Sequence, residues 1–202
     1  MNRAFALAAV AGLAVASSAL AVPVDKNYSR SYEVPLPLAD VAAAPGVTTS
    51  NLTVNDIGLI ATMDYVYVDI THTWVGDLQI TLSGPGGASV SLIDRPGVPQ
   101  SFFGNSDDLN GVYFFEMGGL VFPELVGGAG GIVAPDIYAP ADNFSRFFNT
   151  QKQGEWTLTI TDRAAGDTGV LRAWGFGVTN IPAPGALALM GLGGLAAARR
   201  RR

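Results

Sequence analysis

The fold of this chain is decided by residues 72–82, which read His72-Thr73-Trp74-Val75-Gly76-Asp77-Leu78-Gln79-Ile80-Thr81-Leu82. From Leu78 onward, apolar and polar residues alternate, as they do in a strand with one buried face. The sequence Gly84-Pro85-Gly86-Gly87 follows and can form a turn, after which the chain continues through the apolar residues Val90 and Leu92. This stretch therefore predicts a β-hairpin.

Three further segments have the same two-residue period. Their alternating apolar residues are Val66, Val68 and Ile70 in the first, Trp156, Leu158 and Ile160 in the second, and Trp174, Phe176 and Val178 in the third. Residues 22–181 contain no stretch that keeps helical spacing for ten residues without Gly or Pro. Short strands at hairpin spacing predict an all-β fold, an antiparallel β-sandwich in a single domain.

Composition and charge exclude several classes of protein. The 202 residues are 49% hydrophobic and 14% charged, and they include no Cys, which is typical of one globular domain without disulfide bonds. Residues 22–181 carry all 17 acidic residues but only 7 of the 12 basic ones, a formal charge of −10. A body this acidic repels phosphate backbones, so we expect no nucleic-acid partner.

Residues 1–21 have the pattern of a secretory signal peptide. Arg3 precedes an apolar run over residues 4–16, and the small residues Ala19 and Ala21 match the cleavage pattern of such peptides. The apolar run has no polar face, which argues against an N-terminal core helix. The mature chain is expected to begin near Val22.

Residues 181–202 have the pattern of a sorting tail. Pro182-Ala183-Pro184 precedes a small, apolar run that stops at Arg199, Arg200, Arg201 and Arg202. A helix over residues 185–198 would span about 21 Å, against about 30 Å of bilayer hydrocarbon, and the arginines would keep its C-terminus in the cytoplasm. A plain membrane anchor is the alternative.

This order of features resembles the PEP-CTERM sorting signal of Gram-negative bacteria, with Ala183 at the position where that family usually has Glu. The resemblance implies cleavage near Pro182 and Pro184 by an exosortase-type enzyme. It also implies transient contact of the tail with the inner membrane, export, and a final location at the cell surface or outside the cell.

Two long motifs in the body carry a second resemblance. Their residues are His72, Thr73, Gly76, Asp77 and Leu78 in the first motif and Gly154, Trp156, Asp162, Gly166, Asp167, Gly169 and Trp174 in the second. The first motif is similar to the pattern His-Thr-aromatic-x-Gly-Asp-Leu of the P domain, or P/Homo B domain, of subtilisin-like proprotein convertases. The second is similar to the closing block of the same domain.

The resemblance divides the chain into a signal peptide (1–21), a lead-in segment (22–47), a P/Homo B-like domain (48–180) and a sorting tail (181–202). It implies a jelly-roll-like, galactose-binding-like β-sandwich of the kind that stabilises a subtilisin-like protease domain. No such protease domain is recognisable here. We therefore expect a non-catalytic surface or matrix protein that contacts proteins or polysaccharide. The alternative is an accessory domain that acts in trans on a separate subtilisin-like protease.

Catalytic chemistry has little support in the sequence. A serine protease needs a base beside its nucleophile and a carboxylate behind that base. His72 is the one histidine of the chain and lies within the first motif, and no Gly-x-Ser-x-Gly segment occurs. We therefore expect His72 to be structural, to hold a strand end by hydrogen bonds, and the chain to have no catalytic residues.

Calcium is the one cofactor that the sequence leaves open. Asp107, Asp108, Asp162 and Asp167 lie at turns rich in Gly and Asn, and Ca²⁺ prefers carboxylate and carbonyl oxygens from loops. The spacing fits no EF-hand. The alternative is an ordinary turn, in which each Asp side chain accepts backbone N–H bonds.

Paired aromatic residues raise the further possibility of a carbohydrate surface. The pairs include Phe102-Phe103 and Phe147-Phe148. Because side chains alternate between the two faces of a strand, such pairs more often divide between core and surface. The glycine-rich segment 121–140 is expected to be an exposed loop.

Overall fold

A computed structural model describes residues 24–40, 45–99, 102–114, 132–133 and 137–181. The predicted signal peptide, the tail beyond Ile181 and most of the glycine-rich segment 121–140 lie outside these described residues.

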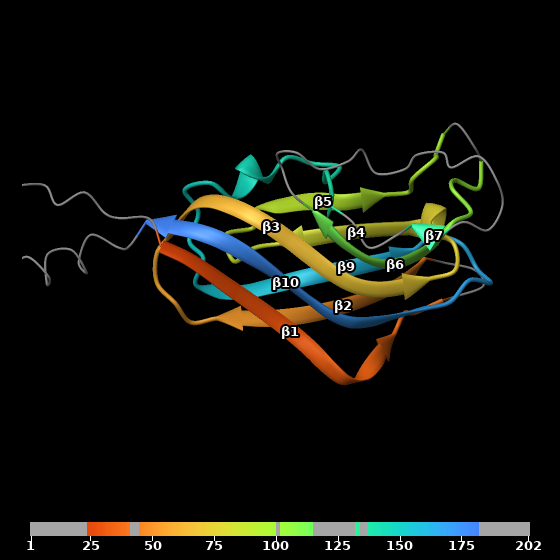
Figure 1. The fold of residues 1–202 in the computed structure, drawn as a ribbon, viewed down its shortest axis with the longest axis horizontal. Helices are drawn as coiled ribbons and strands as arrows, with labels where there is room; N and C mark the ends of the chain where they lie inside the picture. Colours follow the sequence, from red (N-terminus) through yellow and green to blue (C-terminus); the bar gives the residue numbers. More distant parts are fainter. Residues whose placement is uncertain (1–23, 41–44, 100–101, 115–131, 134–136, 182–202) are drawn as a thin grey trace, which may run out of the picture.

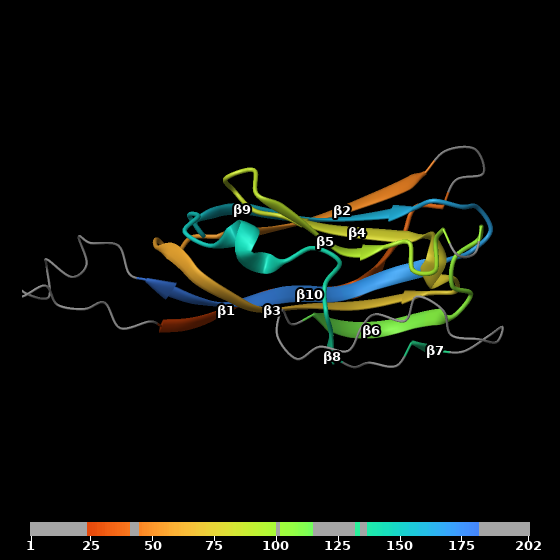
Figure 2. The same ribbon diagram turned by 90° about the horizontal axis from the view of Figure 1, so that it is seen from above.

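Two β-sheets stack face to face (Figures 1 and 2). The first contains, in spatial order, β1 (Val24–Pro37), β10 (Gly169–Ile181), β3 (Leu59–His72), β6 (Asp108–Phe114) and β7 (Ile132–Val133), and β8 (Ile137–Tyr138) also pairs with β6. The second contains β2 (Gly46–Val54), β9 (Gly154–Asp162), β4 (Leu78–Ser83) and β5 (Ser89–Asp94). Two 3-10 turns, η1 (Val75–Asp77) and η2 (Phe144–Phe147), are the only helical segments in the described ranges. The predicted antiparallel sandwich is confirmed, although β7 and β8 pair with β6 in parallel.

The alternating apolar residues of the five predicted strands form the core. All fourteen are at most 2% exposed, and burying each large apolar side chain contributes about 1.5–3 kcal/mol. The rings of Trp156 and Phe176 lie with their centroids 4.4 Å apart between the sheets. The indole N–H of Trp156 donates to the Lys152 carbonyl at 2.9 Å, and that of Trp174 donates to Ser50 Oγ at 2.6 Å. Both buried tryptophans thus satisfy their one polar group.

The β4–β5 hairpin forms as predicted. Leu82 pairs with Val90, and the Gly84 N–H donates to the Ala88 carbonyl at 2.8 Å to close the turn. The turn places Pro85 against Gly154, whose φ of +134° is a conformation that favours glycine. A Cβ at residue 154 would lie 2.5 Å from the Pro85 Cβ, so this motif glycine allows β9 to start directly beside the hairpin.

The lead-in segment contributes a strand that the sequence patterns did not reveal. β1 pairs along most of β10, from Val24 opposite Asn180 to Pro37 opposite Val170. Tyr32 on this strand bonds Ser50 Oγ at 2.5 Å. The segment before residue 48 is therefore part of the sandwich.

The two ends of the sandwich differ in what they carry. β1 begins and β10 ends at one end, on the left of Figure 1, whereas β3 and β9 end and β10 begins at the other. The thirteen residues of β10 span about 40 Å, so the first motif lies far from Ile181. No helix within the described residues is long and apolar enough to cross a membrane.

Candidate functional site

The two sequence motifs meet at one end of the sandwich, where His72 contacts Asp162. His72 closes β3 and Asp162 closes β9, and both residues are at most 2% exposed. His72 Nε2 lies 3.2 Å from Asp162 Oδ2. His72 Nδ1 lies 2.9 Å from the carbonyl oxygen and 3.2 Å from the backbone nitrogen of Trp74. Both ring nitrogens are therefore engaged, one by the opposite sheet and one by the chain that follows β3.

A second contact between the motifs lies beside the first. The Thr73 hydroxyl donates to Asp167 Oδ1 at 2.8 Å and accepts the Thr168 N–H at 3.1 Å. The Thr73 N–H in turn donates to the Thr168 carbonyl at 3.2 Å. Residues more than 90 positions apart thus fix the turn between β9 and β10 against the end of β3.

Gly76 lets two further segments approach this end. Its N–H donates to the Asn105 carbonyl at 2.8 Å. A Cβ at residue 76 would lie 2.5 Å from the Asn105 nitrogen and 2.8 Å from Gly104 Cα, closer than packed atoms come. The motif glycine is required because the η1 turn and the segment 104–105 touch backbone to backbone.

Asp77 is buried without a hydrogen bond to its carboxylate from the described residues. It is 4% exposed, and its backbone groups are used by Trp74 and Arg163. Burial, together with the negative charges of Asp162 and Asp167, raises the pKa of Asp77 to about 6. Asp77 is the unpaired charge of the site.

The remaining motif residues divide between this end and the rest of the sandwich: Leu78 pairs with Asp162 and Gly169 with His72, whereas Gly154, Trp156 and Trp174 lie away from the site. Gly154 and Trp156 stand at the opposite end of β9, Trp174 is in the core, Leu78 is buried at the start of β4, and Gly166 and Gly169 belong to the turn before β10 and to its first residue. Only part of the sequence resemblance therefore maps to one site.

The four predicted calcium ligands lie at the same end but do not converge on one point. Asp162 Oδ2 lies against His72 and its Oδ1 accepts the Ala164 N–H at 3.3 Å, while Asp167 is bonded by Thr73. Asp107 is buried, whereas Asp108 is exposed at the start of β6. Within the described part of the chain, no group of three or more His, Cys, Asp or Glu side chains could hold a metal ion. The geometry favours the ordinary-turn interpretation for Asp162.

The aromatic pairs divide in two ways. Phe147 is buried and Phe148 is 39% exposed, as expected for a pair that faces both core and surface. Phe102 and Phe103 are both exposed, at 85% and 65%, and their rings meet edge to face with centroids 5.1 Å apart.

An open pocket of about 320 Å³ lies beside Asp77. Its walls are Trp74, Phe103, Ala164, Ala165 and the two carboxylates Asp77 and Asp167. The Trp74 indole N–H donates to the Phe103 carbonyl at 2.7 Å, which holds the aromatic residues in place. The motifs marked Asp77 and Asp167, but no sequence pattern indicated that Phe103, Ala164 and Ala165 share a pocket with them.

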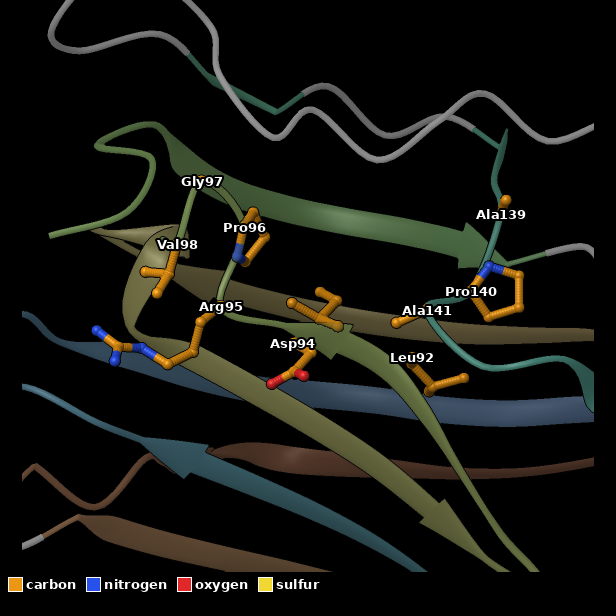
Figure 3. Close-up of a pocket in the computed structure, with 10 residues that line it drawn as sticks. Leu92, Asp94, Arg95, Pro96, Gly97, Val98, Ala139, Pro140 and Ala141 are labelled. Atoms are coloured by element: carbon orange, nitrogen blue, oxygen red, sulfur yellow. The ribbon is translucent and has the colours of Figure 1, made fainter. Parts of the chain in front are cut away.

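A second pocket, of about 220 Å³, lies between the chain after β5 and the segment 139–141 (Figure 3). Figure 3 shows Pro96 and Val98 on one side and Pro140 on the other. Its two charged residues have partners: Asp94 accepts from Gln79 at 2.9 Å, and Arg95 donates to the Gly76 carbonyl at 3.3 Å. The other described residues of this pocket are apolar or glycine, so it offers less for chemistry than the pocket beside Asp77.

Comparisons with known proteins agree with both resemblances. Residues 65–112 and 138–178 match the family model of the proprotein convertase P-domain. The predicted P-domain is confirmed. Residues 180–202 match the PEP-CTERM protein-sorting motif, so the P-domain is followed almost directly by a sorting signal.

Among curated proteins, the chain is 30% identical over 111 residues to a calcium-dependent protease of Nostoc sp.. That match covers 54% of this chain and 12% of the relative, so the P-domain chain spans only a small part of the relative's length.

Among solved structures, the chain is similar to the serine protease of Aeromonas sobria, alone and in complex with its chaperone. The sequence identities are 17% and 18%, and the TM-score is 0.48 in both cases. The matches cover 82% and 81% of this chain and 28% of the other chains.

Proposed function

We propose that this protein is an exported, non-catalytic P-domain that is sorted to the bacterial cell surface or extracellular matrix and acts there as an interaction module. The observation that carries the proposal is the adjacency of the two matches: the P-domain match ends at residue 178 and the sorting-motif match begins at residue 180. A domain of a family that accompanies proteases is here followed by a sorting signal.

The surroundings of His72 support a non-catalytic role. A general base needs a free ring nitrogen within reach of the group that it deprotonates. Both nitrogens of His72 are engaged, and the residue is 1% exposed. We expect an imidazole in this position to stabilise the junction of β3 and β9 rather than to act on a substrate.

The sorting partner in this proposal is an exosortase-type enzyme. Its processing site would lie at Pro182 and Pro184, directly after the last residue of β10. During processing the tail would contact the inner membrane, while the end of the sandwich that carries His72 and Asp77 would point away from it, because that end lies about 40 Å along β10 from Ile181.

A second candidate function is that of an accessory domain which acts in trans on a separate subtilisin-like protease. The similarity to the Nostoc sp. protease favours it. Any peptidase activity would then belong to the partner enzyme.

Cross-linking in the native cell envelope distinguishes the two functions. The full exported protein is the bait, and captured partners are identified by mass spectrometry. Recovery of polysaccharide or other sorted surface proteins supports the interaction module. Stoichiometric recovery of a secreted subtilisin-like protease contradicts it and establishes the accessory role.

A further inference from the structure

We infer that the pocket beside Asp77 binds an organic cation, the ammonium or guanidinium group of a lysine or arginine side chain on a partner protein. The cation would lie between the Asp77 carboxylate and the rings of Trp74 and Phe103. This inference rests on the proposed function as an interaction module and names the chemistry that the module recognises.

The first observation is that Asp77 lacks a partner. Its carboxylate lines the pocket although the residue is 4% exposed. Among the described residues no side chain or backbone N–H donates to it, and no cation lies within ion-pair distance. Every fully buried side-chain oxygen of the described residues has a hydrogen-bond partner, so the Asp77 carboxylate, which has none, is open to the solvent in the pocket. A cation that enters the pocket would pair with this carboxylate in a charge-assisted contact.

The second observation is the composition of the walls. Trp74 and Phe103 line the pocket together with Asp77, and the faces of aromatic rings attract cations electrostatically, tryptophan most strongly. The hydrogen bond from the Trp74 indole to the Phe103 carbonyl fixes the two residues relative to one another. Phe103 is 65% exposed, which leaves its ring available to a ligand.

The third observation is the local charge. Asp162 and Asp167 act on Asp77 with like charge, and only His72 and Arg95 oppose them. Arg95 is held by the Gly76 carbonyl at 3.3 Å. The negative field around the pocket, on a body of formal charge −10, selects a positively charged partner.

The same geometry disfavours Ca²⁺ as the occupant. Calcium takes six to eight oxygen ligands, whereas Asp167 is already bonded by Thr73 and Asp162 by His72 and Ala164. Among the described residues of the pocket, the Asp77 carboxylate and Asp167 Oδ2 accept no hydrogen bond. These oxygens are too few for calcium, and beside the aromatic residues Trp74 and Phe103 they suit a monovalent organic cation.

The three tryptophans of the chain allow a direct test by NMR. Trp156 and Trp174 are fully buried, so Trp74 reports on the pocket and the other two indole N–H signals serve as internal controls. The native exported protein, labelled with ¹⁵N, is titrated with N-acetyl-lysine amide, N-acetyl-arginine amide and the neutral isostere N-acetyl-norleucine amide. Calcium chloride forms a fourth titration.

We expect both cationic probes to shift the Trp74 signal with dissociation constants on the order of 1 mM, and the norleucine probe to leave it unchanged. Equal shifts with norleucine, shifts with none of the probes, or a response to calcium alone would each overturn the inference.

A pair of variants adds a second measurement. Asp77→Asn keeps the shape of the side chain and should weaken cation binding about tenfold or more, because it removes a charge-assisted contact. Glu155→Gln removes the same charge from an exposed residue at the far end of β9 and should leave binding unchanged. Equal affinities of the two variants would contradict the inference.

Cross-linking with the Asp77→Asn variant separates this inference from the proposed function. If wild type and variant capture the same surface partners in equal amounts, the module stands and the cation site is wrong. If the wild type captures a partner and the variant loses it, both are supported. If the wild type captures only a protease, the proposed function fails, while the probe titrations still decide the pocket chemistry.

Discussion

At the scale of single residues, the contact between His72 and Asp162 holds the two sheets together. Replacing His72 by Ala would leave a buried carboxylate without its main partner and should cost about 2–4 kcal/mol. For a domain of this size we expect a fall in melting temperature on the order of 10 °C, measured by circular dichroism. A variant that keeps the wild-type melting temperature but loses a hydrolytic activity would show that His72 is catalytic.

Asp77 makes stability depend on pH in an unusual direction for a carboxylate. Its pKa is about 6 in the folded state, chiefly because of burial and the nearby Asp162 and Asp167, against an ordinary 3.8; His72 and Arg95 oppose this effect only in part. Asp77 therefore keeps its proton to a higher pH in the folded state than in the unfolded state. As pH rises from about 4 to about 6, its contribution to the free energy of unfolding falls, by about 3 kcal/mol at most.

Asp77→Asn should abolish this dependence. We expect the variant to match the wild type near pH 4 and to be more stable above pH 6, in urea unfolding series compared with the Glu155→Gln control. A variant that is less stable than the wild type at pH 7 would contradict the description of Asp77 as an unpaired buried charge.

The sequence predicted some of the site residues but not how they are arranged. His72, Asp162, Thr73 and Asp167 were all marked by the motifs, yet the two pairs are separated by 90 and 94 positions. No local pattern encodes such pairings, because they arise only when β3 and β9 end at the same edge. The pocket at Asp77 depends in addition on where the chain brings Phe103.

At the scale of elements, a substitution in the η1 turn tests how tightly this turn packs against the segment 104–105. Gly76→Ala would push a Cβ into the backbone of residues 104–105 and should destabilise the domain by about 1–3 kcal/mol. Gly86→Ala is the matched control, because a Cβ at residue 86 meets nothing within 4 Å. Equal melting temperatures of the two variants would contradict the close approach.

The lengths of two strands show where period-two patterns fail. β3 begins at Leu59, whereas the alternating pattern begins only at Tyr65. The pattern misses the first residues because bulges opposite β10 place the buried residues Ile60, Met63 and Val66 three apart. β1 is an edge strand whose core contacts, Tyr28, Tyr32 and Leu36, lie four apart. The spacing of three in β3 breaks the period of two. The spacing of four in β1 keeps it, but Arg30 and Val34 at the positions between are exposed, so no run of alternating apolar residues marks this strand.

At the scale of the whole molecule, the effect of calcium on stability tests whether the end of the sandwich with His72 and Asp162 is held by hydrogen bonds or by a metal ion. Binding at Asp107, Asp108, Asp162 and Asp167 would raise the melting temperature in millimolar calcium relative to a chelator. Because Asp162 and Asp167 are already hydrogen-bonded, we expect no difference. A clear rise in calcium would show that these carboxylates rearrange into a metal site.

The two ends of the sandwich have different roles in the proposed function. The end with Ile181 leads into the sorting tail, and the end with His72 and Asp77 carries the pocket. The sorting tail and the pocket beside Asp77 are thus about 40 Å apart. This separation suits a domain that is sorted to the cell surface and whose pocket faces away from the membrane.

The intact mass of the protein recovered from the cell surface tests this account most directly. We predict a mature form that begins near Val22 and ends close to Pro182 and Pro184, without Arg199 to Arg202. A surface form whose mass still includes the four arginines would contradict sorting-linked cleavage and indicate a membrane-anchored protein instead.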